Sequence, residues 1–399
     1  MNKIVKRIFI GVGGVVCSTV LVAGLYVSYV MLSYNRIGNC DIAVDRKSAL
    51  SEVQTGQNYK AISYNIGFGA YSQDFTFFMD TGYDDDGKPT CGYWSKGRSK
   101  DEVEFNTKGA IETALNENPD FVMFQEVDKD STRSYHIDQD RRIQDQFGAY
   151  DHTYAVNFHT AFLPYPLYDM HGAVLGGMST ISRYQLGDSR RISYTISDSL
   201  SRFFDLDRCF TYSKVKVNAG GEQKWLYLAN SHMSAYDEGG KIREKQVQEL
   251  NAFLTQCAEE GAYVVLGGDW NHDLLRNNPD FSYTDSNRPF GMTKRDPDWL
   301  AQFFSYDEAS KTYKSPLPEG YKVVASDKDK NGVLTPTCRN NDIEWEPGKT
   351  FTCCVDGFIV SSNVKVNKHY NIRTKNGKKG FDEFAFSDHD PSVLEFELI

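Results

Sequence analysis

Short apolar runs alternate with longer amphipathic stretches from about residue 59 to the C-terminus. Six apolar runs have the length of strands and end at glycine, proline or polar residues: 59–69, 121–127, 224–233, 262–273, 353–362 and 390–399. Two stretches, 101–120 and 241–261, carry apolar residues at helical spacing, and the first helix is expected to stop before Pro119. Strands that alternate with helices predict packed α/β layers.

The N-terminus has a different pattern. Residues 8–32 contain no charged side chain and follow three cations, Lys3, Lys6 and Arg7. A bilayer core needs about 20 apolar helical residues, whereas the apolar part of a removed signal peptide has about 7 to 15. The length therefore predicts a retained, single-pass transmembrane helix.

This anchor divides the chain into three parts. We expect the membrane helix over residues 1–33, a polar linker over 34–58 and one folded domain over 59–399. Positive charges on the N-terminal flank favour a cytoplasmic N-terminus, with the folded domain on the other side of the membrane. The sequence does not decide whether the anchor is later cleaved.

Composition narrows the class of protein. With 40% hydrophobic and 25% charged residues, the chain is typical of a globular protein, which excludes wholesale disorder, a collagen-like fibre and a multi-span membrane protein. The net charge is −10, and the sequence has no basic stripe of the kind that neutralises nucleic-acid phosphates. An acidic protein can still act on phosphates, because a bound divalent metal supplies positive charge.

The eight cysteines suggest no metal site. Zinc is not expected, because no CxxC pair or Cys/His ladder is present. A disulfide between Cys91 or Cys338 and the adjacent pair Cys353 and Cys354 stays open, since connectivity cannot be deduced from spacing.

Acids, amides and imidazoles stand at the ends of the predicted strands. They are Asn65, Glu126, His232, Asp269, Asn271, Asp356, Asp388 and His389. A single Asp or Asn after a strand is usually a turn former. Together, carboxylates, amides and two histidines without a nucleophilic Ser or Cys fit metal-assisted hydrolysis of a phosphate ester.

The segments around these residues resemble the endonuclease/exonuclease/phosphatase superfamily, of which deoxyribonuclease I is a member. The motifs occur in the family order: "SYNIG", "FQEV", "GMSTISRY", "NSHMSA", "IREKQVQEL", "GGDWNHD", "VDGFIVS" and "SDHDPSVLEFEL". The resemblance runs from about Lys60 to Leu398. It implies a four-layer α/β sandwich, in which two mixed sheets pack face to face with helices outside.

The resemblance also implies a metal site. It makes Glu126 the principal ligand of a divalent cation, Mg²⁺ with Mn²⁺ as the alternative, because oxygen ligands suit a hard ion. Asn65 would orient the metal or the phosphate, and Asp388 would lie near the metal. Some branches carry an acid two positions after the strand asparagine, where this chain has Gly67, so one metal is favoured over two.

The remaining motif residues would carry out the reaction. Asp269 would position or deprotonate the attacking water, and Asn271 would donate a hydrogen bond to a phosphoryl oxygen. His389 would contact the phosphate, while Asp356 would fix its tautomer and keep it protonated. His232 would stabilise developing negative charge or protonate the leaving oxygen.

Four other features have weaker functional interpretations. His171 and Arg183 are candidate substrate contacts, although Arg183 would equally well brace a strand end. The aromatic residues of the insertion 71–100 would either line a substrate cleft or pack among themselves. Residues 327–332, "DKDKNG", look like half of a calcium loop, but Cys338 stands where the last ligand should be, which favours a polar turn.

The sequence thus predicts a divalent-metal-dependent phosphoric ester hydrolase that works by in-line attack of water. A phosphodiesterase, a nuclease and a phospholipase C or sphingomyelinase-like enzyme all fit, with an inositol or sugar phosphomonoesterase as an alternative. From another class, a catalytically silent surface binding module is the competing hypothesis. The expected partners are the phosphate-ester substrate and the membrane, and no protein partner is implied.

Overall fold

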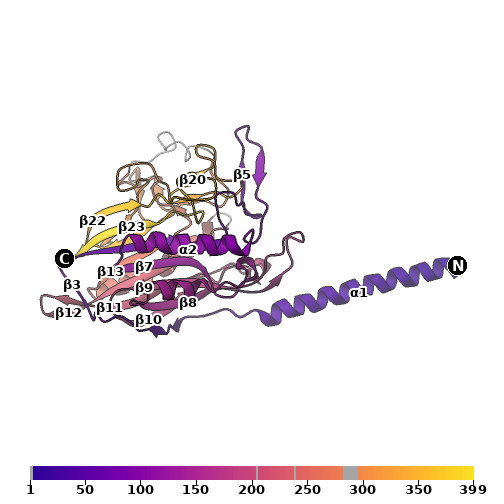
Figure 1. The fold of residues 1–399 in the computed structure, drawn as a ribbon, viewed down its shortest axis with the longest axis horizontal. Helices are drawn as coiled ribbons and strands as arrows, with labels where there is room; N and C mark the ends of the chain where they lie inside the picture. The colour runs from indigo at the N-terminus through magenta and orange to yellow at the C-terminus, as the bar shows by residue number, and fades with distance from the viewer. Residues whose placement is uncertain (1–2, 204, 238–239, 282–294) are drawn as a thin grey trace.

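A computed structural model describes residues 3–203, 205–237, 240–281 and 295–399, and two large mixed sheets form its centre (Figure 1). The first sheet has the order β1 (Cys40–Asp41), β10 (Leu186–Ser193), β11 (Cys209–Ala219), β12 (Glu222–His232), β13 (Tyr263–Asp269), β21 (Asp356–Ser361) and β18 (Tyr321–Val324), with β3 (Val53–Gln54) beside β11. The second has the order β2 (Val44–Asp45), β8 (Asp151–Leu163), β9 (Gly172–Ser182), β7 (Phe121–Asp128), β4 (Asn58–Asn65), β23 (Ser392–Leu398) and β22 (Val364–Asn371).

The helices and the smaller strands lie around these sheets. The helices are α1 (Lys3–Ser33), α2 (Lys100–Asn116), α3 (Gln139–Gln146) and α4 (Lys241–Glu259). Paired short strands are β5 (Thr81–Tyr83) with β6 (Pro89–Cys91), β14 (His272–Asp273) with β15 (Ala301–Gln302), β16 (Ser305–Asp307) with β17 (Thr312–Lys314), and β19 (Cys338–Arg339) with β20 (Thr352–Cys353).

The core consists of three apolar layers. Between the sheets, side chains of both inner faces meet, among them Met123 and Leu394 from one sheet and Val265 and Phe358 from the other. On the outer face of the first sheet, α4 packs its apolar stripe. Outside the second sheet, α2 and α3 do the same. The predicted four-layer α/β sandwich is therefore confirmed.

The segment 34–58 differs from the expected linker. Its short strands β1 and β2 join opposite sheets, and β3 pairs with β11. Strands of two residues add a few ladder hydrogen bonds at sheet edges but leave no alternating pattern in the sequence.

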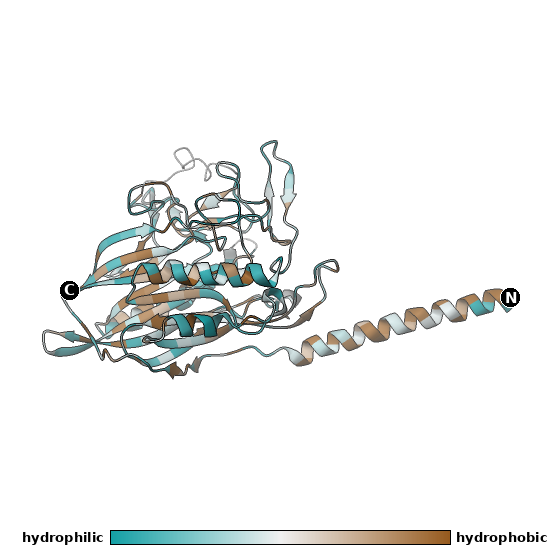
Figure 2. Ribbon diagram, viewed as in Figure 1, coloured by the Kyte–Doolittle hydropathy of each residue, from teal (hydrophilic) through white to brown (hydrophobic). Residues whose placement is uncertain are grey.

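The helix α1 extends away from the sandwich (Figure 1), and apolar residues cover most of its length (Figure 2). Its 31 residues are long and apolar enough to cross a membrane, and the most apolar part of the helix has no buried side chain within the protein. Length and composition are also compatible with a signal sequence.

None of the eight cysteines takes part in a disulfide in the structure. Cys338 stands opposite Cys353 in the β19–β20 ladder without a disulfide between them, while Cys91 is exposed on β6. Residues 327–332 form a polar turn, in which the carboxylate of Asp329 accepts hydrogen bonds from the backbone N–H groups of Asn331 and Val333.

Candidate active site

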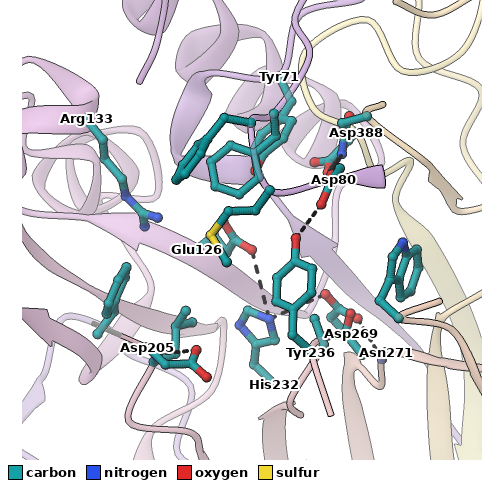
Figure 3. Close-up of a pocket in the computed structure, with 18 of the residues that line it drawn as sticks. Tyr71, Asp80, Glu126, Arg133, Asp205, His232, Tyr236, Asp269, Asn271 and Asp388 are labelled. Carbon is teal, nitrogen blue, oxygen red and sulfur yellow. Dashed lines mark hydrogen bonds and ion pairs between the residues drawn. The ribbon is translucent and has the colours of Figure 1, made fainter. Parts of the chain in front are cut away.

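The ends of five strands meet at one end of the sandwich. Parallel pairing of β12 with β13 sets His232 opposite Asp269, and antiparallel pairing of β13 with β21 sets Asp269 opposite Asp356. In the facing sheet, parallel pairing of β4 with β7 sets Asn65 opposite the residue before Glu126. The two sheets thereby bring Glu126, His232 and Asp269 to one pocket (Figure 3). Asn65 and Asp356 do not line this pocket but contact residues that do.

His389 and Asp356 form a buried ion pair. The Nδ1 atom of His389 lies 2.7 Å from Oδ2 of Asp356, and its Nε2 atom lies 3.8 Å from Oδ2 of Asp269. Burial opposes a charged imidazole, but Asp356 and Asp269 together hold the pKa of His389 well above its ordinary value. The ligand atoms of these three residues lie within 4.8 Å of one another. A protonated His389 compensates one of the two carboxylates, so the cluster keeps one negative charge.

Asp269 is suited to accept a proton. Its Oδ2 atom accepts a hydrogen bond of 3.0 Å from the amide of Asn65, and its Oδ1 atom accepts one of 3.0 Å from the backbone N–H of Asn271. Burial raises the pKa of Asp269 to about 6, against the opposing effect of His389. A carboxylate with a pKa near neutrality is ionised at pH 7 and is more basic than an ordinary aspartate.

The pKa of His232 is shifted in the opposite direction to that of His389. Burial, with the nearby charges of Arg208 and His389, holds its pKa well below the ordinary value, so the imidazole is neutral. Its Nε2 atom lies 3.5 Å from Oδ2 of Asp269 and 4.0 Å from Oε1 of Glu126. A neutral imidazole at this position can donate one hydrogen bond to a substrate oxygen.

Glu126 points into the pocket because β7 is irregular at this point. The pairing of β7 with β9 shifts register between Phe124 and Val127, and Glu126 has a φ of 53°. A bulge of this kind turns a side chain out of the regular alternation of a strand. Burial raises the pKa of Glu126, while Arg133 lowers it.

Among the described residues, the carboxylates that line the pocket have no lysine or arginine within salt-bridge distance, and three of them lie together near the amides of Asn65 and Asn341. Glu126 is one, and the others are Asp388 and Asp80, which both accept hydrogen bonds from the amide of Asn341, at 2.8 and 3.0 Å. Buried carboxylates without a paired cation are costly. Their oxygen atoms are the ligands that Mg²⁺ and Mn²⁺ prefer, so the donor set fits a hard divalent ion.

The two predicted asparagines lie in the site but have other partners than expected. Asn65 directs its amide nitrogen toward Glu126 and Asp269, while its oxygen accepts from the backbone N–H of Gly67 at 2.9 Å. Asn65 therefore acts as a hydrogen-bond donor to both carboxylates, and its oxygen is occupied by the backbone of Gly67. The side-chain amide of Asn271 donates to the carbonyl of Met233 at 2.9 Å.

Of the two candidate substrate contacts, the structure brings only one to the pocket. His171 lines the wall, with its Nδ1 atom 2.7 Å from the carbonyl of Ser95, and burial lowers its pKa to about 4. Arg183 lies at the opposite end of the second sheet, where it binds Asn118 and the hydroxyl of Tyr150. It directly follows β9, whose last residue pairs with the first residue of β7, so the expected phosphate contact is wrong.

The pocket has a volume of about 490 Å³ and contains groups that the sequence did not single out. Three nearly buried cations line it: Arg133, Arg208 and Arg339. Tyr236 donates a short hydrogen bond to Asp80. These residues lie in loops, in a short 3-10 helix (Thr132–Ser134) and in the two-residue strand β19, and no motif marks them, although the aromatic insertion 71–100 indicated the right region. Phe77 and Phe78 of this insertion line the pocket and also pack against each other, so both expectations for it hold.

Arg133 is fixed by two contacts. Its guanidinium makes a bidentate ion pair with Asp128, at 3.0 and 2.9 Å, and lies 3.9 Å from the centre of the Phe68 ring. A clamped arginine of this kind keeps a positive charge near the carboxylate of Glu126 without a direct bond to it.

Comparison with known proteins agrees with this architecture. The model of the Endonuclease/Exonuclease/phosphatase family matches residues 62–389. One similar solved structure is TDP2 from D. rerio with a single-strand DNA product, at 14% identity and a TM-score of 0.50, with 86% of this chain and 99% of that chain covered. Another is ANGEL2, a 2',3'-cyclic phosphatase, at 14% identity and a TM-score of 0.51, with 90% of this chain and 98% of that chain covered. No curated protein matches the sequence. Because the family model spans most of the folded domain and the strand-end residues of its motifs meet in one pocket, the chain belongs to the endonuclease/exonuclease/phosphatase family.

Proposed function

We propose that this protein is a divalent-metal-dependent hydrolase of phosphate esters, in which water attacks phosphorus in line with the leaving oxygen. One observation carries the proposal. A basic carboxylate, an ion-paired imidazolium and carboxylates without a cation face the same cavity, which is the charge arrangement that phosphoryl transfer to water needs.

Glu126 and Asp388 are the residues that would hold the metal, with Asp80 close by. When bound, a divalent ion neutralises charge on the phosphoryl oxygens and polarises the reacting groups. Gly67, two residues after the end of β4, supplies no acid, and a Cβ atom there would lie 2.5 Å from the ring of Tyr71 at a φ of +52°. Because a side chain does not fit there, we favour one metal ion.

The other residues orient the reactants and transfer protons. Asp269 takes the proton of the attacking water, and the N–H donors of Asn65 and Asn271 keep its carboxylate in position. The Nε2–H group of His389 binds a phosphoryl oxygen, and Asp356 keeps this imidazole charged and correctly oriented. His232 donates a hydrogen bond to the charge that develops on an oxygen in the transition state.

We further propose that α1 stays attached as a single-pass anchor. The helix is bound to the folded domain, because Tyr26 donates a hydrogen bond of 3.0 Å to the carbonyl of Phe162 and Tyr29 accepts one of 3.3 Å from the N–H of the same residue. A signal peptide that is removed would not be expected to make such contacts with the mature domain.

The test uses the full chain, purified in detergent, with bis(4-nitrophenyl) phosphate as a soluble diester. We expect hydrolysis that a chelator abolishes and Mg²⁺ or Mn²⁺ restores, with the rate lowered at least 100-fold in Glu126→Gln. The matched control is Glu222→Gln on the exposed β11–β12 turn, which should keep the wild-type rate. A Glu126→Gln protein as active as the control would refute the proposed site.

A further inference from the structure

A cluster of exposed apolar side chains covers the tip of the β8–β9 hairpin, residues 162–170. Its members are exposed by 38% to 76%: Phe162, Tyr165, Leu167, Tyr168 and Met170. The one charged residue in this segment, Asp169, turns inward, where it accepts from the N–H of Ser95 and pairs with Lys96 at 3.1 Å. An exposed apolar patch without an exposed charge indicates a site that contacts a membrane or another apolar surface.

This tip lies beside the membrane helix. Both hydrogen bonds between α1 and the domain described above reach Phe162, and Figure 1 shows the loop after β8 projecting on the side from which α1 extends. At a rise of 1.5 Å per residue, the 31 residues of α1 span about 46 Å, more than a hydrocarbon core of about 30 Å. Tyr26 and Tyr29, near its C-terminal end, therefore fall at the level where tyrosines favour the membrane interface.

The same tip forms one wall of the active-site pocket. Leu163 and Tyr165 line the cavity, and the ring of Tyr165 lies 5.7 Å from that of Phe78. Met79 also lines the cavity, together with the carboxylates of Glu126 and Asp388 and the imidazoles of His232 and His389. The cavity thus matches a molecule that carries a phosphate ester next to an apolar portion.

We propose that the β8–β9 tip docks into the bilayer that α1 spans, and that the substrate is a phosphate ester in the head group of a lipid of that bilayer. The inference rests on the proposed function and extends it to a substrate class. Because α1 contacts the tip at Phe162 and the tip forms a wall of the pocket, the pocket lies next to the lipid surface, and a head group reaches the carboxylates without its acyl chains leaving the membrane.

A nucleic acid fits these observations less well. A polynucleotide needs exposed cations along its path, yet the arginines that line the pocket, Arg133, Arg208 and Arg339, are each exposed by 5% or less. Within the described part of the chain, no lysine lines the cavity. The net charge of −10 also repels a polyanion.

Docking is tested by fluorescence in vesicles of phosphatidylcholine brominated on its acyl chains. The full chain carries Leu167→Trp, and the matched control carries Leu50→Trp, an exposed leucine paired with Tyr184 at the far end of the second sheet. We expect bromine to quench Leu167→Trp measurably more than the wild type, and Leu50→Trp no more than the wild type. Equal quenching of the two variants would overturn docking, and this readout does not depend on activity.

The substrate class is tested with vesicles that contain phosphatidylcholine, sphingomyelin, phosphatidylglycerol and phosphatidylinositol. The full chain should release a head group from one of these lipids, and Leu167→Glu should lower that rate at least 10-fold while leaving hydrolysis of the soluble diester unchanged. Leu50→Glu should equal the wild type in both assays. Leu167 is 76% exposed and does not line the pocket, so its substitution leaves fold and chemistry intact.

The remaining outcomes separate this inference from the proposed function. Hydrolysis of the soluble diester or of plasmid DNA, with all four lipids untouched, would overturn the lipid substrate and leave the hydrolase assignment standing. Equal lipid rates for Leu167→Glu and the wild type would overturn the role of the tip. No hydrolysis of any ester in the presence of Mg²⁺ or Mn²⁺ would overturn the proposed function itself.

Discussion

Two buried histidines of the pocket differ in charge because their neighbours differ. Desolvation disfavours the imidazolium form of both, yet His389 contacts Asp356 directly, whereas His232 faces the positive charges of Arg208 and His389. One site thus contains a charged donor and a neutral donor at the same pH. This division suits a reaction in which one group meets a phosphate in the ground state and another meets charge that develops later.

The role of Asp269 is tested by Asp269→Asn, which keeps the shape of the side chain and removes the proton acceptor. We expect turnover of the soluble diester to fall by about 10² to 10⁴-fold, the usual contribution of a general base. The melting temperature should stay the same or rise, because one buried carboxylate is removed. A variant with a near-normal rate would exclude Asp269 as the base.

His369 predicts a pH dependence of stability that is independent of catalysis. This residue of β22 is partly buried, with its Nε2 atom 2.8 Å from the hydroxyl of Ser392, and desolvation lowers its pKa from 6.5 to about 3. Below pH 6.5 the unfolded chain gains a proton that the folded chain excludes. The stabilisation is therefore complete above pH 6.5 and is lost as the pH falls toward 3, at about 1.4 kcal/mol per pKa unit.

The variant His369→Gln keeps a hydrogen-bonding side chain without this titration. We expect its melting temperature to fall less than that of the wild type between pH 7 and pH 4.5, with both proteins in the same detergent. Parallel decreases in the two proteins would show that His369 does not bind its proton as the structure indicates.

The sequence indicated which residues come together mainly where a residue stands at or next to a strand end. Glu126, His232, Asp269, Asp388 and His389 line the pocket, and Asp356 contacts His389 from behind it, because strand pairing and the turns next to the strand ends position these residues. Asp80 and Arg133 were missed, since a loop and a short 3-10 helix bring them to the site and no motif marks them. The phosphate contact expected for Arg183 does not form, because β9 runs antiparallel to β7. The end of β9 therefore lies next to the start of β7, away from the pocket.

At the level of elements, the predicted strands and helices exist, but the hairpins β8–β9 and β10–β11 were largely overlooked. Their sequences mix polar and apolar residues. The register of β8 against β9 shifts twice, which interrupts the alternation of buried and exposed side chains along β8. The polar helix α3 has the sequence QDRRIQDQ, so it carries almost no apolar stripe. Buried polar partners hold such elements, and sequence periodicity cannot detect these contacts.

The alignment of β12 with β13 depends on a glycine. A Cβ atom at Gly268 would lie 2.4 Å from the backbone oxygen of Ser231, so Gly268→Ala must push the two strands apart next to the pair of His232 and Asp269. We expect a loss of about 1 to 3 kcal/mol in stability and at least a 10-fold loss in turnover.

The matched control for this prediction is Gly148→Ala. There the new methyl group meets only the carbonyl of Asp145 at 3.7 Å, an ordinary contact. Melting temperature and turnover of the two variants are compared on the soluble diester. If Gly268→Ala behaves like Gly148→Ala, strand spacing at this point does not control the site.

For the whole molecule, metal binding should be visible without turnover. An ion that binds only the folded chain stabilises it and so raises its melting temperature. At an ion concentration of 100 times the dissociation constant, the free energy of unfolding rises by about 2.7 kcal/mol. We expect Mg²⁺ or Mn²⁺ to stabilise the wild type and Asp269→Asn, and to stabilise Glu126→Gln far less. An equal rise in all three proteins would show that the ion binds elsewhere.

The charge distribution around α1 predicts the side of the membrane on which the pocket opens. Lys3, Lys6 and Arg7 precede the apolar stretch, and on its other flank Arg36 is paired with Asp207 at 3.4 Å, so its charge is compensated. Uncompensated cations stay on the cytoplasmic side. An epitope added after the exposed C-terminal residue Ile399 should therefore bind antibody on intact cells, whereas an epitope at the N-terminus should bind only after permeabilisation. The reverse pattern would place the catalytic domain in the cytoplasm and would make lipids of the cytoplasmic leaflet the ones within reach of the pocket.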